Sequence, residues 1–133
     1  MGIKSDLDKN FDFEIVDEFL DHYAMMSESM EIIILDLSKP TMRRRSVDEL
    51  FRIFHNIKSA SGYLEILPMQ KLSAFVEDAL DVLRKIDKEI TKETIDWLLN
   101  ISDMFSQWYD DLKNDNDLSK IKYSLLKLPD MEK

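Results

Sequence analysis

One stretch organises the rest of the chain: Leu50-Phe51-Arg52-Ile53-Phe54-His55-Asn56-Ile57-Lys58-Ser59-Ala60-Ser61-Gly62-Tyr63-Leu64. Its apolar residues recur at spacings of three and four, which predicts an amphipathic helix in which each residue advances about 100°. The side predicted to face a core carries Leu50, Phe54, Ile57, Ser61 and Leu64. The outer side, within about 60° of His55, carries Asp48, Phe51, Arg52, Ser59 and Gly62. Because small residues follow His55 on this side, a partner could reach its imidazole ring.

The composition favours a single helical domain. The chain has 133 residues, enough for one core, and a hydrophobic fraction of 44%, which is typical of globular proteins. It contains only 2 glycines and 3 prolines, which favours long helices over a turn-rich β-sandwich.

Charge and cysteine content exclude several classes of protein. The net charge of −9 argues against nucleic acid and anionic membranes as partners, because both attract clustered cations. The chain has no cysteine, so neither a disulfide nor a thiolate metal site is available. The first ten residues do not resemble a signal peptide, and no apolar run approaches the roughly 20 residues that span a bilayer. A cytoplasmic location is therefore expected.

Apolar periodicity predicts four main helices. The first begins at about Phe13 and ends before Pro40, and the second runs from a capping box at Ser46 and Glu49 to about residue 65. The third begins around Pro68 and continues to about residue 86. The fourth is capped by Thr91 and ends before a polar turn at residues 114–117, and a short fifth helix with Leu118, Ile121, Leu125 and Leu126 precedes Pro129.

These elements predict an all-α fold. Short loops should make successive helices antiparallel, which gives an up-and-down four-helix bundle with a short fifth C-terminal helix. Residues 1–12 are predicted to be a flexible leader, residues 13–128 the helical bundle, and residues 129–133 a C-terminal tail. Trp108, at the edge of the fourth apolar stripe, could pack internally or against a partner.

Residues 41–45 are predicted to form a loop that contains three consecutive arginines. In an acidic chain this run is a local reversal of charge. It can be interpreted as a solvated loop or as a contact to an acidic partner.

The sequence offers little for metal, hydrolytic or nucleotide chemistry. The two histidines, His22 and His55, lie on different predicted helices, and no HExxH or carboxylate-rich bundle motif accompanies them. No GxSxG, P-loop or dinucleotide motif is present. The domain is therefore expected to hold neither a metal nor a cofactor and to have no ATP site of its own.

The helix register predicts that His55 has two charged neighbours. Lys58, three residues on, lies about 60° round the same helix and could neutralise an anionic group on the ring. The next helix runs antiparallel, and Glu77 lies about 11 residues after the turn, as His55 lies about 11 before it, so the two should meet at the same height. A carboxylate that accepts Nδ1–H leaves the Nε2 lone pair facing outward and makes the ring a better nucleophile. This arrangement suits the receipt of a phosphoryl group from another protein and its onward transfer.

The segment His55-Asn56-Ile57-Lys58-Ser59-Ala60-Ser61-Gly62 resembles the phosphorylation motif of histidine phosphotransfer domains, most closely that of the N-terminal domain of CheA-type chemotaxis histidine kinases. Leu72-Ser73-Ala74-Phe75-Val76-Glu77-Asp78-Ala79-Leu80-Asp81 resembles the third helix of the same family. The resemblance implies that His55 is the phosphoacceptor, Lys58 the conserved lysine and Glu77 the supporting glutamate. Two residues depart from the pattern: Ser59 replaces a preferred glycine, and Ala74 stands where chemotaxis kinases often carry a second histidine.

Three interpretations of the chain follow, one of which is an unrelated helical adaptor in which His55 and Glu77 would lie far apart. In the first it is a phosphocarrier of two-component signalling, a separate protein or part of a histidine kinase, with no ATP site of its own. The resemblance implies as partners a receiver domain of a response regulator and a kinase catalytic domain in cis or in trans, with Mg²⁺ bound in the partner. In the alternative, it is an interaction bundle of a signalling complex that is not phosphorylated. Phe51, with Arg52 at its rim and Ser59 and Gly62 beside the ring, is predicted to form the docking surface, although Phe51 could instead pack at the core edge.

Overall fold

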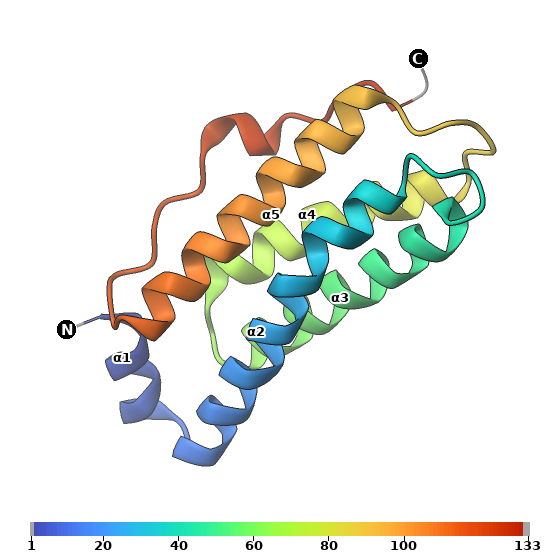
Figure 1. Ribbon diagram of the computed structural model, residues 1–133. Helices are drawn as coiled ribbons and strands as arrows, with labels where there is room; N and C mark the ends of the chain where they lie inside the picture. The colour runs from blue at the N-terminus through green and yellow to red at the C-terminus, as the bar shows by residue number, and fades with distance from the viewer. Residues whose placement is uncertain (1, 132–133) are drawn as a thin grey trace.

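A computed structural model describes residues 2–131, and these form helices and connecting segments with no strand. The α-helices are α1 (Ile3–Asn10), α2 (Phe13–Asp36), α3 (Arg43–Tyr63), α4 (Leu67–Arg84) and α5 (Lys92–Lys113), and a 3-10 helix, η1, spans Tyr123–Leu126 (Figure 1). The predicted leader begins at Met1 and the predicted tail includes residues 132–133, and these three residues lie outside the described part of the chain. No helix within residues 2–131 has both the length and the apolar character needed to cross a membrane.

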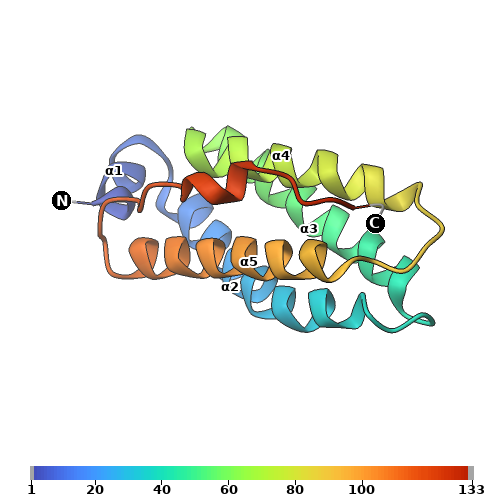
Figure 2. The ribbon, with the colours of Figure 1, turned by 90° about the horizontal axis from the view of Figure 1, so that it is seen from above.

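Helices α2 to α5 form the predicted antiparallel four-helix bundle. Helix α3 packs mainly against α4, and α2 packs against both α5 and α3, as the two views show (Figures 1 and 2). The connections between successive bundle helices are short, which makes neighbours antiparallel. The all-α fold class expected from periodicity is confirmed.

The bundle core is built from large aromatic and aliphatic side chains. Tyr23, Phe54, Phe105 and Trp108 are fully buried, and the Phe105 ring meets both Phe54 and Trp108 edge to face. The Tyr23 hydroxyl donates to the Phe105 carbonyl at 2.6 Å, and burial, followed by the charge of Asp111, raises the pKa of Tyr23 well above its ordinary value. Trp108 therefore packs internally, which resolves the choice that its sequence position left open.

The structure differs from the predicted flexible leader. Residues Ile3–Asn10 form helix α1, which packs against α5 and α2 and buries Leu7. Asp115 accepts a hydrogen bond from the Ser5 amide at 2.9 Å and a second from the Ser5 hydroxyl. Gly2 lies so close to the carbonyl of Asp115 that a Cβ atom would be 2.0 Å from that oxygen. The anchor is 110 residues away in sequence, and local periodicity does not detect such a contact.

The predicted start of the second bundle helix is wrong. Helix α3 begins at Arg43, so the arginine run forms its first turn, and Ser46 is buried inside the helix. The Lys39 carbonyl accepts from the amides of Met42 and Arg43, which closes the preceding turn without a capping side chain. Arginine has a high helix propensity, and the helix therefore extends one turn before the capping-box pattern.

The segment after α5 returns along the surface of that helix (Figure 2). The indole N–H groups of Trp108 and Trp97 donate to the carbonyls of Ser119 and Leu125, at 2.8 and 2.9 Å, respectively. The Thr91 hydroxyl caps α5 by accepting from the Thr94 amide, as predicted, and also donates to the Asp130 carbonyl. The predicted fifth helix is reduced to the single turn of η1, which buries Leu125.

Candidate functional site

A tight link between α3 and α4 sets the relative height of their side chains. The Glu65 and Ile66 amides donate back to the carbonyls of Gly62 and Ser61, and Glu65 adopts a left-handed φ of 60°. This pair of hydrogen bonds is a Schellman motif, which ends a helix sharply. Pro68 lies in the first turn of α4, where its missing N–H removes no helical hydrogen bond.

This link brings His55 and Glu77 together as the register predicts. His55 Nδ1 lies 3.0 Å from Glu77 Oε2, and the Lys58 ammonium donates to Glu77 Oε1 at 2.8 Å. The His55 side chain is 54% exposed, whereas that of Glu77 is only 13% exposed. A half-buried carboxylate between two helices therefore holds an accessible imidazole and a cation at the same time.

The protonation state of Glu77 follows from its surroundings. Burial opposes its ionisation, but the hydrogen bonds from Lys58 and His55, together with their charges, outweigh that effect and lower the pKa of the carboxyl below its ordinary value of 4.5. Glu77 is thus ionised at neutral pH and accepts hydrogen bonds from both neighbours. A neutral imidazole that donates through Nδ1–H carries its lone pair on Nε2.

Phe51 and Arg84 continue the site along the α3–α4 surface. The half-buried Phe51 ring lies nearly parallel to the His55 ring, with centroids 6.3 Å apart. The guanidinium carbon of Arg84 lies 3.7 Å from the centroid of the Phe51 ring, and Arg84 Nε donates to Asp48 at 3.2 Å. Sequence reasoning did not select Arg84. Its position on the polar side of α4, two turns after Glu77, is the sequence feature that could have identified it.

The remaining predicted docking residues lie around His55 on α3. Arg52 and Ser59 are exposed, and Ser59 lines an apolar groove of about 340 Å³ between α2 and α3. His22 and Tyr63 also line this groove, and neither was selected from the sequence. The docking role of all four predicted residues, including Phe51, stays a prediction.

Gly62 has a reason within the fold for lacking a side chain. A Cβ atom there would lie 2.7 Å from the side-chain nitrogen of Gln70, which reaches across from α4. The contact is with the end of a flexible side chain, so a small substituent could be accommodated by movement of Gln70. Gly62 therefore allows α3 and α4 to pack closely, whether or not a partner also contacts this residue.

The site supplies a nucleophile, a carboxylate that orients it and a cation beside it. Within residues 2–131, no group of three or more histidine, aspartate or glutamate side chains is arranged to hold a metal ion. These residues fit the acceptance of an electrophilic group at Nε2 and the stabilisation of negative charge on that group by Lys58.

Comparison with known proteins gives the family. The model of the Hpt domain matches residues 14–115. The chain is 26% identical over 116 residues to Chemotaxis protein CheA of Borreliella burgdorferi, a match that covers 84% of this chain and 13% of that protein. It is 28% identical over 91 residues to Chemotaxis protein CheA of Treponema pallidum and to Sensor histidine kinase CheAY of Helicobacter pylori, covering 68% of this chain and 11% of each. The chain thus spans only a small part of the length of these relatives. No solved structure gives a significant match.

Proposed function

The chain belongs to the Hpt domain family, the histidine phosphotransfer domains of two-component signalling, and on that premise we propose that it carries a phosphoryl group on His55. The observation that supports this assignment most strongly is the pairing of an exposed imidazole with a half-buried carboxylate. Glu77 Oε2 lies 3.0 Å from His55 Nδ1 and accepts its N–H, which leaves Nε2 as the available nucleophile.

The proposed reaction has two balanced steps. The Nε2 lone pair of His55 attacks the terminal phosphorus of ATP held by a kinase domain. An N–P bond forms, the bond to the bridging oxygen breaks, and ADP leaves. In the second step an aspartate carboxylate of a receiver domain attacks the same phosphorus, the N–P bond breaks, and the electron pair returns to Nε2. The proton on Nδ1 stays beside Glu77 in both steps.

Lys58 has a defined part in this scheme. In the structure its ammonium contacts Glu77 Oε1, and its side chain is 31% exposed, so it can move toward the solvent side of the site. A phosphoryl group on Nε2 adds negative charge next to this ammonium. We expect Lys58 to divide its hydrogen bonds between Glu77 and the phosphoryl oxygens, which stabilises the phosphorylated form.

The partners follow from what the site lacks. The chain has no glycine-rich phosphate loop, so ATP and its Mg²⁺ are assigned to a kinase catalytic domain, in cis or in trans. A receiver domain with its own Mg²⁺ is assigned as the other partner, which docks on the surface formed by Phe51, Arg52, Ser59 and Gly62. A cytoplasmic location is proposed for the chain and for both partners.

The relatives give a narrower proposal for the pathway. The curated names describe chemotaxis proteins and a sensor histidine kinase. A chemotaxis signalling complex is therefore the proposed setting, with this chain in the role of the phosphotransfer region.

An interaction bundle without phosphorylation is the competing function. Ser59 and Ala74 are the departures from the family pattern that favour it. A chase experiment separates the two. The chain is labelled by a kinase catalytic domain and ATP, purified, and mixed with a receiver domain and Mg²⁺. The proposal predicts that label moves to the receiver and that a receiver lacking its acceptor aspartate takes none. If several kinase donors leave the chain unlabelled while it still binds them, the interaction bundle is the better account.

A further inference from the structure

A basic cavity lies at the end of the α3–α4 pair where α3 begins, whereas His55 lies near the middle of α3. The cavity has a volume of about 590 Å³ and lies between the first turn of α3 and the end of α4. In Figure 1 this is the right-hand end, where the loop before α3 approaches the end of α4. Its charged lining consists of Arg43, Arg44, Arg84 and Lys85 with Asp48 and Asp87. Twelve positions along the chain lead from Arg43 to His55, about 18 Å along a helix, and the two sites meet at Arg84, which lines the cavity and also lies over the Phe51 ring beside His55.

Arg43 and Arg44 are the uncompensated charges of this cavity. The Nε atom of Arg43 is buried, and no hydrogen-bond partner for it exists among the described residues. Neither arginine forms an ion pair within residues 2–131, whereas the adjacent Arg45 is paired with Glu49 at 2.9 Å. A buried donor without a partner is destabilising and is rare in native proteins, unless a ligand or water satisfies it.

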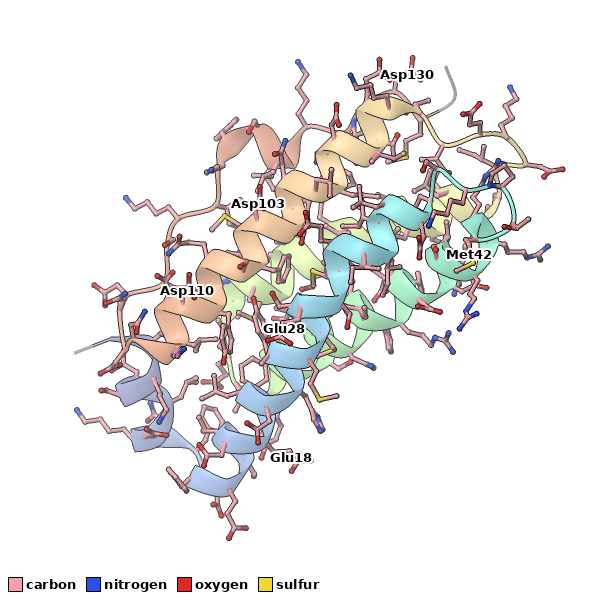
Figure 3. All side chains as sticks on the ribbon, viewed as in Figure 1. Glu18, Glu28, Met42, Asp103, Asp110 and Asp130 are labelled. Atoms are coloured by element: carbon pink, nitrogen blue, oxygen red, sulfur yellow. The ribbon has the colours of Figure 1, made fainter. Side chains whose placement is uncertain are left out.

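The backbone adds positive potential at the same place. Arg43 is the first residue of α3, whose N-terminus has no side-chain cap and no acidic residue in its first turn. The Arg43 amide donates to the Lys39 carbonyl and the Ser46 amide to the Met42 carbonyl, so the amides of Arg44 and Arg45, with the helix dipole, are the backbone groups that favour a bound anion here. Figure 3 shows long side chains that end in nitrogen near the labelled Met42, which directly precedes this turn.

The opposite wall carries charges of both signs. Arg84 and Lys85 come from the end of α4, where Arg84 is paired with Asp48 and Lys85 lies 3.6 Å from Asp81. Asp87 adds a second carboxylate to the lining. Four cationic side chains thus face two carboxylates, in a chain whose overall charge is −9. The lining therefore has an excess of two positive charges, which a ligand with at least two negative charges would balance.

We propose that this cavity binds a small molecule that bears a phosphate or polyphosphate group. The anion accepts hydrogen bonds from the guanidinium groups of Arg43 and Arg44, at the start of α3, and Arg84 and Lys85 face it from the other wall. The volume is larger than one phosphate requires and lies in the range of small-molecule sites, so the phosphate is expected to be part of a larger molecule. The inference does not depend on phosphorylation of His55, since the donors assigned to the anion, Arg43 and Arg44, lie in the first turn of α3, and only Arg84 is shared with the surface beside His55.

The test is a titration of the isotopically labelled chain with pyrophosphate, followed by NMR of the Arg43 Nε–H group and the backbone amides of residues 43–46. The proposal predicts saturable shifts at this end of α3, without saturable shifts at His55. Arg44→Gln should weaken pyrophosphate binding about 10-fold, because it removes a charge-assisted hydrogen bond. Arg43→Gln should do the same, with circular dichroism as a check on folding. Arg45→Gln, which removes the same charge at the next position, should change the affinity by less than about 2-fold, since Arg45 is paired outside the cavity.

Three results would overturn the proposal. Equal weakening by Arg44→Gln and Arg45→Gln would show general attraction to a basic surface. The absence of saturable shifts would show that the cavity holds only water. A glutamate-rich peptide that binds through Arg44 when pyrophosphate does not would assign the cavity to an acidic protein segment.

Discussion

Glu77 on α4 faces His55 on α3, with Glu77 Oε2 at 3.0 Å from His55 Nδ1, and the second carboxylate oxygen of Glu77 binds Lys58 at 2.8 Å. One carboxylate thus sets the direction of the imidazole and holds a cation within reach of it. The proposed phosphoryl transfer depends on this shared contact.

Loss of the Glu77 charge should slow phosphorylation without unfolding the bundle. In Glu77→Gln the neutral amide no longer stabilises the imidazole as positive charge develops. The glutamine side chain has only one acceptor oxygen, so it cannot accept hydrogen bonds from both Nδ1–H and Lys58 as the two carboxylate oxygens do. We expect phosphorylation by a kinase domain to slow by about 10-fold, the scale on which loss of an orienting carboxylate affects a histidine ligand. The measurement is the initial rate of label incorporation. Asp78→Asn, which alters the exposed neighbour of Glu77, is the matched control, and equal rates for the two variants would contradict the assigned role.

Lys58 should act on the phosphorylated state. Lys58→Met removes the cation that is placed to stabilise negative charge beside Nε2, and we expect the rate of phosphoryl gain to fall at least 10-fold, roughly the effect of losing one donor to a developing charge. The control is Lys71→Met on the exposed side of α4. If Lys58→Met gains and loses label at wild-type rates, its contact with Glu77 is purely structural.

Phe51 is predicted to contribute to docking rather than to the core alone. Its ring is half-buried between His55 and Arg84, so Phe51→Ala should lower the free energy of unfolding by about 1–2 kcal/mol, less than the 3–5 kcal/mol of a fully buried phenylalanine. Transfer to a receiver, expressed per folded molecule, should fall in addition. The two measurements are denaturant titration and the chase assay at matched folded concentration. A stability loss of several kcal/mol with unchanged transfer would assign Phe51 to the core.

Helix α1 should be attached in a pH-dependent manner through Asp115. Hydrogen bonds from the Ser5 side chain and then the Ser5 amide lower the pKa of Asp115 below its ordinary value of 3.8. Because the pKa of Asp115 is lowered in the folded protein, the contact stabilises the docked helix fully at pH values above 3.8. This stabilisation is lost as the pH falls through the lowered pKa. Hydrogen exchange should therefore show α1 amides losing protection before the bundle core in acid. Asp115→Asn should reduce protection of α1 at neutral pH, and Asp117→Asn should not. Protection of α1 that is independent of both pH and Asp115 would refute the anchor.

The sequence predicted the central pair because its position depends only on short-range geometry. Two regular helices joined by a short link have a fixed relative height, so counting residues from the turn was sufficient to pair His55 with Glu77. The buried faces of the bundle helices followed in the same way, since helical periodicity identifies the residues that one core must cover.

The sequence-based predictions were wrong or incomplete where tertiary contacts decide the structure. Helix α1 contains few apolar residues and is held by Asp115, which no local pattern connects to it. Trp108 is buried because the segment after α5 covers it and accepts its N–H at Ser119. Ser46 and Glu49 match a capping box, but nothing in that pattern prevents the preceding arginines from continuing the helix. Glu77 binds Lys58 as well as His55. That second contact depends on side-chain orientation, which helical periodicity does not predict.

The most direct test of the account is to locate the phosphoryl group on the chain. The sequence contains two histidines, so wild type, His55→Gln and His22→Gln form a complete comparison. Each is incubated with a kinase catalytic domain, Mg²⁺ and labelled ATP, and the phosphorylated residue is identified by mass spectrometry under basic conditions, which preserve phosphohistidine. The account predicts acid-labile label on His55 in wild type and in His22→Gln, and none in His55→Gln. Label that persists in His55→Gln, or that lies on His22, would contradict it.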